Sequence, residues 1–290
     1  MNSNPAIEFR NVSLGFNGNV VLDEISFSLG NDEMVILTGA SGSGKSVLLR
    51  LAMGLLSPDA GQIFIKGQDI VSLNEADLLT IRGGSMGMVF QEDSLFTGLT
   101  VFENVSYRLD EHGWNEADAR KAVTEILHFV GLDGEEDKLP EELSGGMKRR
   151  VEIARALVGW PSIMLFDEPT MSLDPIMAVQ ILDLVMRARD INGVASIYVT
   201  KKPQEIPYLS EYSAFKVGAD EIIVKEHKHD SRIMVLDAGQ IVFDGDLDQF
   251  YKSEVPGVNN ILTLEQIDHS TNPYFKNPWD PNRRAHERFL

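Results

Sequence analysis

The sequence contains no cysteine, which excludes disulfide bonds and thiolate metal sites and agrees with a reducing compartment. It also lacks any apolar run near the roughly 18 residues of a membrane-spanning helix. The N-terminal segment MNSNPAIEF shows no basic stretch followed by an apolar one, as a secretion signal would. These absences predict a cytoplasmic protein.

Positive charge is scarce, because 26 Lys and Arg residues face 44 Asp and Glu residues, for a formal net charge of -18. Nucleic acids and anionic bilayers are themselves negative, so we expect no nucleic-acid partner and no broad electrostatic adhesion to lipid. An anionic ligand would need a local group of donors. Hydrophobic residues make up 43% of the 290 positions, enough for the buried core of a globular protein.

Such a group of donors follows the apolar segment 33–37, which predicts a short buried strand. The next segment fills every fixed position of the phosphate-binding pattern G-x-x-x-x-G-K-[ST] and leads into a predicted helix. A glycine-rich turn without chemical meaning is the alternative, which the complete match disfavours. Lys45 is expected to reach the β- and γ-phosphates and Ser46 to bind Mg²⁺. The predicted nucleotide-binding residues of this loop are Gly39, Ser41, Gly42, Ser43, Gly44, Lys45 and Ser46.

A second apolar strand, predicted over 162–166, ends in Asp167 and Glu168. Ligands bind at the carboxyl ends of parallel strands, so these carboxylates are expected beside the phosphate loop. Asp167 would hold Mg²⁺, and Glu168 would orient or deprotonate the attacking water. Without the phosphate loop, the pair would be interpreted as the solvated start of a helix. With the phosphate loop in the same chain, a catalytic role is favoured.

A third motif, Leu143-Ser-Gly-Gly-Met147, begins a predicted helix with Ser144 as its N-cap, so the amides of Ser144, Gly145 and Gly146 could bind a second anion. The motif resembles the signature LSGGQ of ATP-binding-cassette (ABC) transporter ATPases, with Met147 replacing glutamine. The resemblance implies an ATPase that uses ATP and Mg²⁺ and works as a homodimer beneath integral-membrane permease subunits. It would lie at the cytoplasmic face of the inner membrane, with each signature motif closing over the partner's nucleotide.

The resemblance covers roughly residues 6–250 and assigns further positions. Phe16 would stack on adenine, Gln91 would contact Mg²⁺ and the water, and Asp174 would lie in the loop that crosses the dimer interface. Lys201 stands where the family has a catalytic histidine. The resemblance gives Gln91, Glu168 and Lys201 as catalytic, and Ser46, Gln91 and Asp167 as metal ligands.

The motif order predicts an α/β fold, a P-loop NTPase (RecA-like) core with an N-terminal antiparallel β layer and an inserted α-helical subdomain. Residues 1–256 would form a single nucleotide-binding domain, with its core at 6–95 and 162–250 and its helical subdomain at 96–161. Three prolines among aromatic residues within 273–281 predict an extended C-terminal arm over 257–290, the alternative being a solvated tail.

Two stretches bear on cargo. Residues 92–112 and 143–150 are similar to those of ATPases of the maintenance-of-lipid-asymmetry (Mla) group, which implies phospholipid transport and lipid-binding accessory subunits. The alternative is an importer of amino acids or other polar solutes, because core motifs do not specify cargo. An ATPase of translation or DNA repair would be expected to carry two cassettes, a long coiled coil or a basic surface, and this chain has none of these.

Two departures from the family pattern lie near residue 200. Lysine can donate hydrogen bonds but cannot accept one as neutral histidine can, so Lys201 predicts slower hydrolysis with ATP binding retained. The alternatives are a tolerated replacement and a regulatory module with weak turnover. Residues 201–233 predict a surface insertion with a strand at 221–225. Within it, His227 and His229 are interpreted as part of a solvated turn, a metal site being the alternative.

Overall fold

A six-stranded sheet forms the centre of the molecule, in a computed structural model that describes residues 4–217, 221–229 and 231–271. Its strand order is β12-β11-β3-β8-β7-β6, and all neighbours are parallel except β12, which is antiparallel to β11. The strands β3, β8 and β7 are buried along their whole length because helices or a second sheet cover both faces. The strands are β3 (Met34–Thr38), β6 (Met86–Val89), β7 (Ile163–Asp167), β8 (Ala195–Val199), β11 (Arg232–Asp237) and β12 (Gln240–Gly245).

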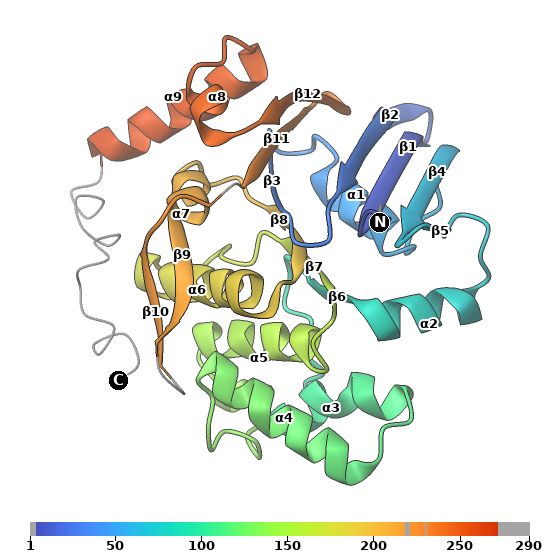
Figure 1. The fold of residues 1–290 in the computed structure, drawn as a ribbon, viewed down its shortest axis with the longest axis vertical. Coiled ribbons are helices and arrows are strands. Elements are labelled where there is room, and N and C mark those ends of the chain that lie inside the picture. Colours follow the sequence, from blue (N-terminus) through green and yellow to red (C-terminus); the bar gives the residue numbers. More distant parts are fainter. Residues whose placement is uncertain (1–3, 218–220, 230, 272–290) are drawn as a thin grey trace.

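A four-stranded antiparallel sheet with the order β2-β1-β4-β5 lies beside it, as Figure 1 shows. Asn17 and Gly18, both with positive φ, form the two-residue turn between the first two strands. The predicted N-terminal antiparallel β layer is therefore observed. The strands are β1 (Ile7–Phe16), β2 (Asn19–Leu29), β4 (Ala60–Ile65) and β5 (Gln68–Asp69).

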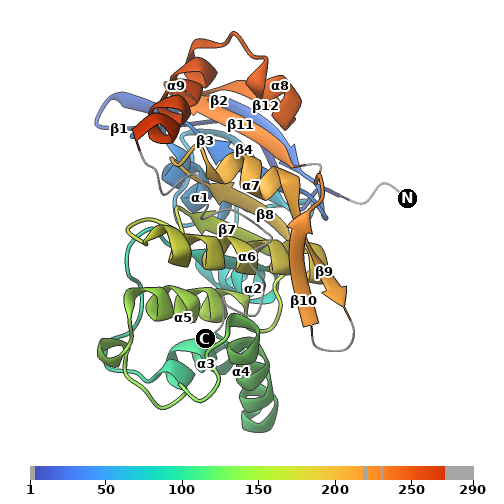
Figure 2. The same cartoon turned by 90° about the vertical axis from the view of Figure 1, so that its left-hand side faces the viewer.

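Helices flank these sheets, and α3, α4 and α5 pack together at one end of the molecule (Figures 1 and 2). The Asn115 side chain caps α4 by accepting from the Asp118 amide, and Gly131 ends that helix in a left-handed conformation. The helices are α1 (Lys45–Ala52), α2 (Glu75–Ser85), α3 (Val101–Glu111), α4 (Glu116–Val130), η1 (Pro140–Glu142), α5 (Gly145–Leu157), α6 (Pro175–Asn192), α7 (Glu205–Glu211) and α8 (Leu247–Tyr251).

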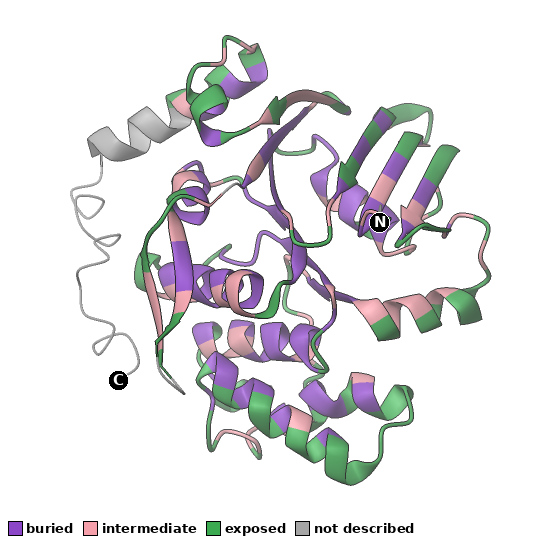
Figure 3. Ribbon diagram, in the orientation of Figure 1, coloured by how far each residue is buried: buried purple, intermediate pink, exposed green. Residues whose placement is uncertain are grey.

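Two hydrophobic cores lie on opposite faces of the six-stranded sheet, and Figure 3 shows the buried strands between them. Alternate residues of β3 serve each core: Met34 and Ile36 belong to the core that contains α5 and α6. Val35 and Leu37 belong to the core that contains α1 and the antiparallel sheet. The two N-terminal helix ends expected to bind phosphate therefore come from helices on opposite faces.

Residues 212–226 form a hairpin of β9 (Tyr212–Val217) and β10 (Glu221–Glu226). The predicted strand over 221–225 is confirmed, but it pairs only with β9, in a separate two-stranded sheet against α6. No group of three or more His, Cys, Asp or Glu residues that could hold a metal occurs within the described ranges.

The prediction of an extended arm from residue 257 is wrong for its first part, because Pro256–Thr271 form helix α9. Proline at the first position is compatible with a helix, and residues 257–271 contain no further proline. Buried Val258 and Ile261 anchor this helix. The proline-rich stretch 273–281 lies outside the described residues. None of the described helices is both long and apolar enough to cross a membrane.

Candidate nucleotide-binding and hydrolysis site

The phosphate loop runs from the end of β3 to the start of α1. At Gly39, φ is 144°, and a Cβ atom there would lie 2.0 Å from the Leu236 carbonyl oxygen, so only glycine fits. Lys45 is 3% exposed, and its ammonium donates to the carbonyls of Gly39 at 2.8 Å and Ala40 at 2.7 Å and to Ser43 Oγ at 3.3 Å. The lysine thus contacts oxygen atoms of its own loop.

Burial lowers the pKa of Lys45 to about 8, and the positive charge of Lys201 acts in the same direction. The carboxylates of Glu168 and Asp167 oppose this shift. Because a phosphate group would favour the charged ammonium, anion binding should raise the pKa of Lys45 again.

Ser46 and Asp167 come together at the start of α1 and the end of β7, where Ser46 Oγ donates to Asp167 Oδ1 at 3.0 Å. Burial raises the pKa of Asp167, while the bond from Ser46 and the charges of Arg50 and Lys201 oppose that shift. A hydroxyl and a carboxylate are the oxygen ligands that Mg²⁺ prefers, so this pair fits the metal.

Glu168 and Lys201 form an ion pair at the ends of β7 and β8, with 2.7 Å between Glu168 Oε1 and Lys201 Nζ. The Glu168 side chain is 9% exposed and that of Lys201 is 36% exposed. Glu168 has φ of 48°, in the left-handed region that is uncommon for residues other than glycine. The residue in the position of the family histidine thus contacts the proposed catalytic carboxylate directly.

Gln91 follows β6, and its side-chain amide donates to Met171 Sδ at 3.0 Å. The amide is thus directed at the loop after Glu168, and the role of Gln91 as a metal ligand stays a prediction. The loop containing Gln91 is instead attached to α5 through its backbone.

That attachment is the Glu152 cluster, which comprises Ser94, Arg149, Glu152 and Arg155. Arg149 donates to the carbonyls of Phe90 at 2.7 Å and Gln91 at 3.1 Å, and also to Glu152 at 2.7 Å. Glu152 accepts from the Ser94 amide at 2.6 Å, and Arg155 donates to the Ser94 carbonyl at 2.9 Å. Burial raises the pKa of Glu152, and Arg149 opposes the shift.

The signature motif begins α5, where Ser144 is the N-cap and its Oγ accepts from the Met147 amide at 3.3 Å. Gly145 lies exposed beside it. Gly146 lies against α6, since a Cβ atom there would be 2.6 Å from Met177 Cε. Asp174 caps α6 by accepting from the Ile176 and Met177 amides at 3.0 Å. Ile176, which begins α6 together with Pro175, is 62% exposed.

Of the other predicted nucleotide-binding residues, Phe16, Ser41 and Gly42 are exposed, whereas Gly44 is buried. Phe16 is exposed at the end of β1, next to the turn at Asn17 and Gly18. Ser41 is exposed in the phosphate loop, between the buried strand β3 and the partly buried start of α1, whereas Gly42 has positive φ and Gly44 is the left-handed N-cap residue of α1.

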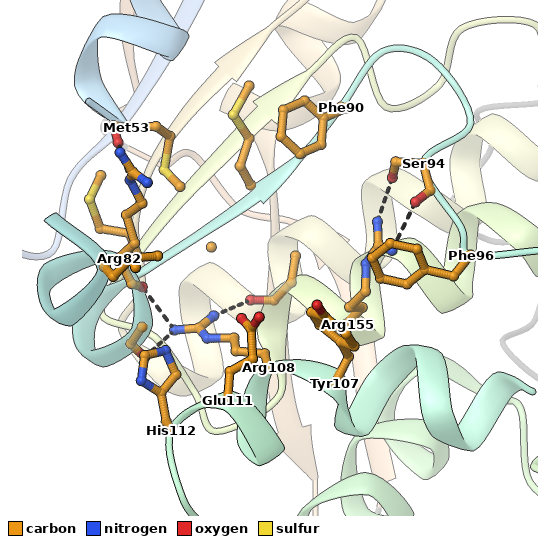
Figure 4. Close-up of a pocket in the computed structure, with 16 residues that line it drawn as sticks. Met53, Arg82, Phe90, Ser94, Phe96, Tyr107, Arg108, Glu111, His112 and Arg155 are labelled. Atoms are coloured by element: carbon orange, nitrogen blue, oxygen red, sulfur yellow. Dashed lines mark hydrogen bonds between the residues drawn. The ribbon is translucent and has the colours of Figure 1, made fainter. Parts of the chain in front are cut away.

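A groove of about 400 Å³ lies between α2, α3 and the segment that follows Gln91 (Figure 4). Figure 4 shows Arg82, Arg108 and His112 at one end and Phe96 and Arg155 at the other. Arg108 donates to the carbonyls of Ala156, Arg82 and Gly83, so its charge is bound to backbone. The groove therefore presents aromatic and aliphatic surface beside fixed guanidinium groups.

Sequence comparison gives the class of protein. Residues 22–171 match the family model described as "ABC transporter". The chain is 33% identical over 271 residues to methionine import ATP-binding protein MetN 1 of Staphylococcus aureus (strain MW2), covering 91% of this chain and 73% of that protein. The chain belongs to the ABC transporter ATPase family.

Two further relatives are also named as import ATP-binding proteins. The chain is 35% identical to methionine import ATP-binding protein MetN of Leifsonia xyli, over 82% of this chain and 65% of that protein. It is 36% identical to Fe(3+) ions import ATP-binding protein FbpC of Escherichia coli O157:H7, over 77% of this chain and 60% of that protein. The chain thus spans somewhat less than two thirds of the length of these two relatives.

The fold is that of known ABC cassettes. The dimeric structure of MJ0796, a bacterial ABC transporter cassette, matches with a TM-score of 0.71 and 28% identity, over 83% of this chain and 98% of that one. A post-hydrolysis dimer of MJ0796 with ADP and Pi matches with a TM-score of 0.70 and 27% identity, over the same shares of the two chains. The predicted P-loop NTPase fold class is confirmed. The finer resemblance to phospholipid-transport ATPases is not supported, because these relatives are named for methionine and Fe³⁺ import.

Sequence reasoning missed the buried polar residues behind the site, namely Arg149, Glu152 and Glu205. Their only sequence signal is a charged side chain among apolar helix residues, as where Glu152 lies between Val151 and Ile153. That signal does not indicate which distant loop such a residue will contact.

Proposed function

We propose that this chain is the ATP-hydrolysing subunit of an ABC importer for a polar solute, acting as a homodimer beneath integral-membrane permease subunits. Residues 1–256 would be a single nucleotide-binding domain with a core at 6–95 and 162–250 and a helical subdomain at 96–161. The observation that carries the catalytic part is the convergence of Ser46, Asp167, Glu168 and Lys201 around the phosphate loop.

In this proposal the phosphate-loop amides bind the ATP phosphates, and Lys45 leaves its loop carbonyls to donate to the β- and γ-phosphates. Ser46 and Asp167 hold Mg²⁺, which when bound neutralises phosphate charge. Glu168 orients or deprotonates the water, and Lys201 donates to the γ-phosphate while its contact with Glu168 keeps that carboxylate in register.

The dimer is supported by the positions of the two helix ends. The start of α1 and the signature end of α5 belong to helices on opposite faces of the sheet, so two copies would each complete the other's site. Ser144, Gly145, Gly146 and Met147 would cover the partner's nucleotide, with Asp174 at the interface, and Phe16 would stack on adenine. The exposed Ile176 gives this interface apolar area.

The groove in Figure 4 is proposed as the docking place of a permease helix at the cytoplasmic face of the inner membrane. It adjoins the loop of Gln91, so a docked helix would act on a proposed ligand of the metal. Its aromatic and aliphatic surface suits an amphipathic helix.

Replacement of the proposed base tests the catalytic part. In Glu168→Gln we expect kcat for ATP hydrolysis to fall by roughly 100-fold or more, with ATP affinity within about tenfold of the native chain. Glu125→Gln, at an exposed position on α4, is the matched control and should hydrolyse ATP normally. Native turnover in Glu168→Gln would contradict the proposal.

Cargo needs a separate experiment. Polar-solute import is favoured by the names of the relatives, and phospholipid transport by the similarity of residues 92–112 and 143–150 to the Mla group. The chain should be purified from native membranes with its bound proteins and lipids identified by mass spectrometry. A permease for amino acids or metal ions would support the proposal, whereas a permease carrying phospholipid would replace it with the lipid reading.

A further inference from the structure

A buried carboxylate lies directly behind the Lys201–Glu168 pair. Glu205 is the first residue of α7 and is 1% exposed. Its Oε2 accepts from Tyr198 Oη at 2.9 Å and Thr200 Oγ1 at 2.7 Å, and its Oε1 accepts from Thr170 Oγ1. Lys202 Nζ lies 3.8 Å from Oε1. We call Thr170, Tyr198, Thr200, Lys202 and Glu205 the Glu205 cluster.

A buried carboxylate is costly unless it is hydrogen-bonded, and here three hydroxyl groups and one ammonium surround it. Burial raises the pKa of Glu205, and Lys202 and the three hydroxyls oppose that shift. Burial also raises the pKa of Tyr198 well above its ordinary value, and the charge of Glu205 adds to the effect. An apolar side chain would fill the space at lower cost, so packing alone does not account for the acid.

The donors come from both segments that carry the ion pair. Thr200 immediately precedes Lys201, and Thr170 lies two positions after Glu168. Lys202 strengthens the connection, because its Nζ donates to the Thr170 carbonyl at 2.7 Å and its amide donates to Thr200 Oγ1 at 2.9 Å. One carboxylate therefore joins the loop after β8 to the loop after β7.

We propose that Glu205 is a positioning residue for ATP hydrolysis, which fixes Lys201 against Glu168 by binding Thr200 on one loop and Thr170 on the other. It is buried behind the ion pair and acts through these two loops. The proposal rests on the proposed roles of Glu168 and Lys201. Misplacement of such a contact by about 1 Å can cost on the order of 100-fold in rate.

Two isosteric variants test this inference at the same carboxylate oxygen. Thr200→Val and Tyr198→Phe each remove one hydroxyl donor to Glu205 Oε2, but Thr200 adjoins Lys201 and Tyr198 lies inside strand β8. Thr200→Val should lower kcat roughly tenfold with KM for ATP within about twofold. Tyr198→Phe should lower kcat less than about twofold. Both unfolding midpoints in urea should shift by similar amounts.

Glu205→Gln is a third variant, which keeps the shape of the side chain but replaces one acceptor oxygen with a donor. It should lower kcat roughly tenfold while ATP affinity stays within about twofold. Equal kcat in Thr200→Val and Tyr198→Phe, or a loss of kcat matched by the loss of ATP affinity, would show a purely structural role and overturn the inference. Native turnover in Glu168→Gln would instead contradict the proposed function, so the two failures are distinguishable.

Discussion

Two loops that follow the strands on either side of β7 are each attached through a buried glutamate, but to different parts of the molecule. The loop after β6, with Gln91, is bound by the Glu152 cluster to α5, the helix that begins with the signature motif. The loop after β8, with Lys201, is bound by the Glu205 cluster to the loop after β7. We therefore expect Gln91 to move with the helical group and Lys201 to stay with Glu168.

The two clusters also differ in the chemical groups that bind the glutamate. Glu152 is bound to a buried arginine, whose side chain is 6% exposed, whereas Glu205 is bound mainly to neutral hydroxyl groups. A buried arginine that loses its carboxylate remains as an uncompensated charge, which is strongly destabilising. Hydroxyl groups can turn to other acceptors or to water.

The largest expected effect is therefore a difference in stability between Glu152→Ala and Glu205→Ala. Glu152→Ala leaves Arg149 as a buried unpaired charge and should cost about 3–5 kcal/mol of the free energy of unfolding. Glu205→Ala leaves three hydroxyls and the more exposed Lys202, and should cost about 1–3 kcal/mol. Urea denaturation of both variants measures the two values. A larger loss for Glu205→Ala would reverse the comparison.

A smaller effect is expected at the residue that the Glu205 cluster positions. Because histidine can accept a hydrogen bond and lysine cannot, Lys201→His should hydrolyse ATP roughly 10- to 100-fold faster than the native chain. ATP affinity should change less than about tenfold, since either side chain can donate to a phosphate. Steady-state ATPase assays and nucleotide titration give both quantities.

Lys201→Arg is the matched variant, because arginine also donates only. It should remain as slow as the native chain. Equal rates for the native chain and Lys201→His would mean that lysine is a tolerated replacement at this position.

The smallest expected effect is the uptake of protons when ATP binds. The pKa of Lys45 is lowered to about 8, so the residue is partly neutral at pH 8.5. Bound phosphate favours the ammonium, and ATP binding at pH 8.5 should take up roughly half a proton or more. The affinity for ATP should therefore fall as the pH rises through 8, because Lys45 must then take up a proton when ATP binds.

Calorimetric titration in two buffers with different ionisation enthalpies measures this uptake. Lys201→Ala removes a charge that lowers the pKa of Lys45, so its uptake at pH 8.5 should be smaller. Identical heats in both buffers at pH 8.5 would contradict the shifted pKa.

The sequence was most informative where chemistry or steric restriction limits the choice of residue. The phosphate loop, the N-cap Ser144 and the strand ahead of Asp167 could all be located, because each depends on residues close in the chain. Because the carboxyl ends of parallel strands lie at the same edge of a sheet, Asp167 was expected beside the phosphate loop. The hydrogen bond between Ser46 and Asp167 confirms this placement.

What could not be predicted depends on contacts between distant segments. Lys201 was recognised as unusual, but its ion pair with Glu168 requires the register of β7 against β8. Glu205 reads as an ordinary acid at the start of a short helix until Thr170 is placed beside it. The helix over 256–271 was missed because prolines further along the chain dominated the interpretation.

The internal partners of the two lysines bear on ligand selectivity. In the structure, Lys45 is bound to its own loop and Lys201 to Glu168. A small anion such as inorganic phosphate can replace one of these partners, but it then gains little over the contact that it breaks. A triphosphate can engage both cations at once, so the site should discriminate by the number of linked phosphates more than by negative charge alone.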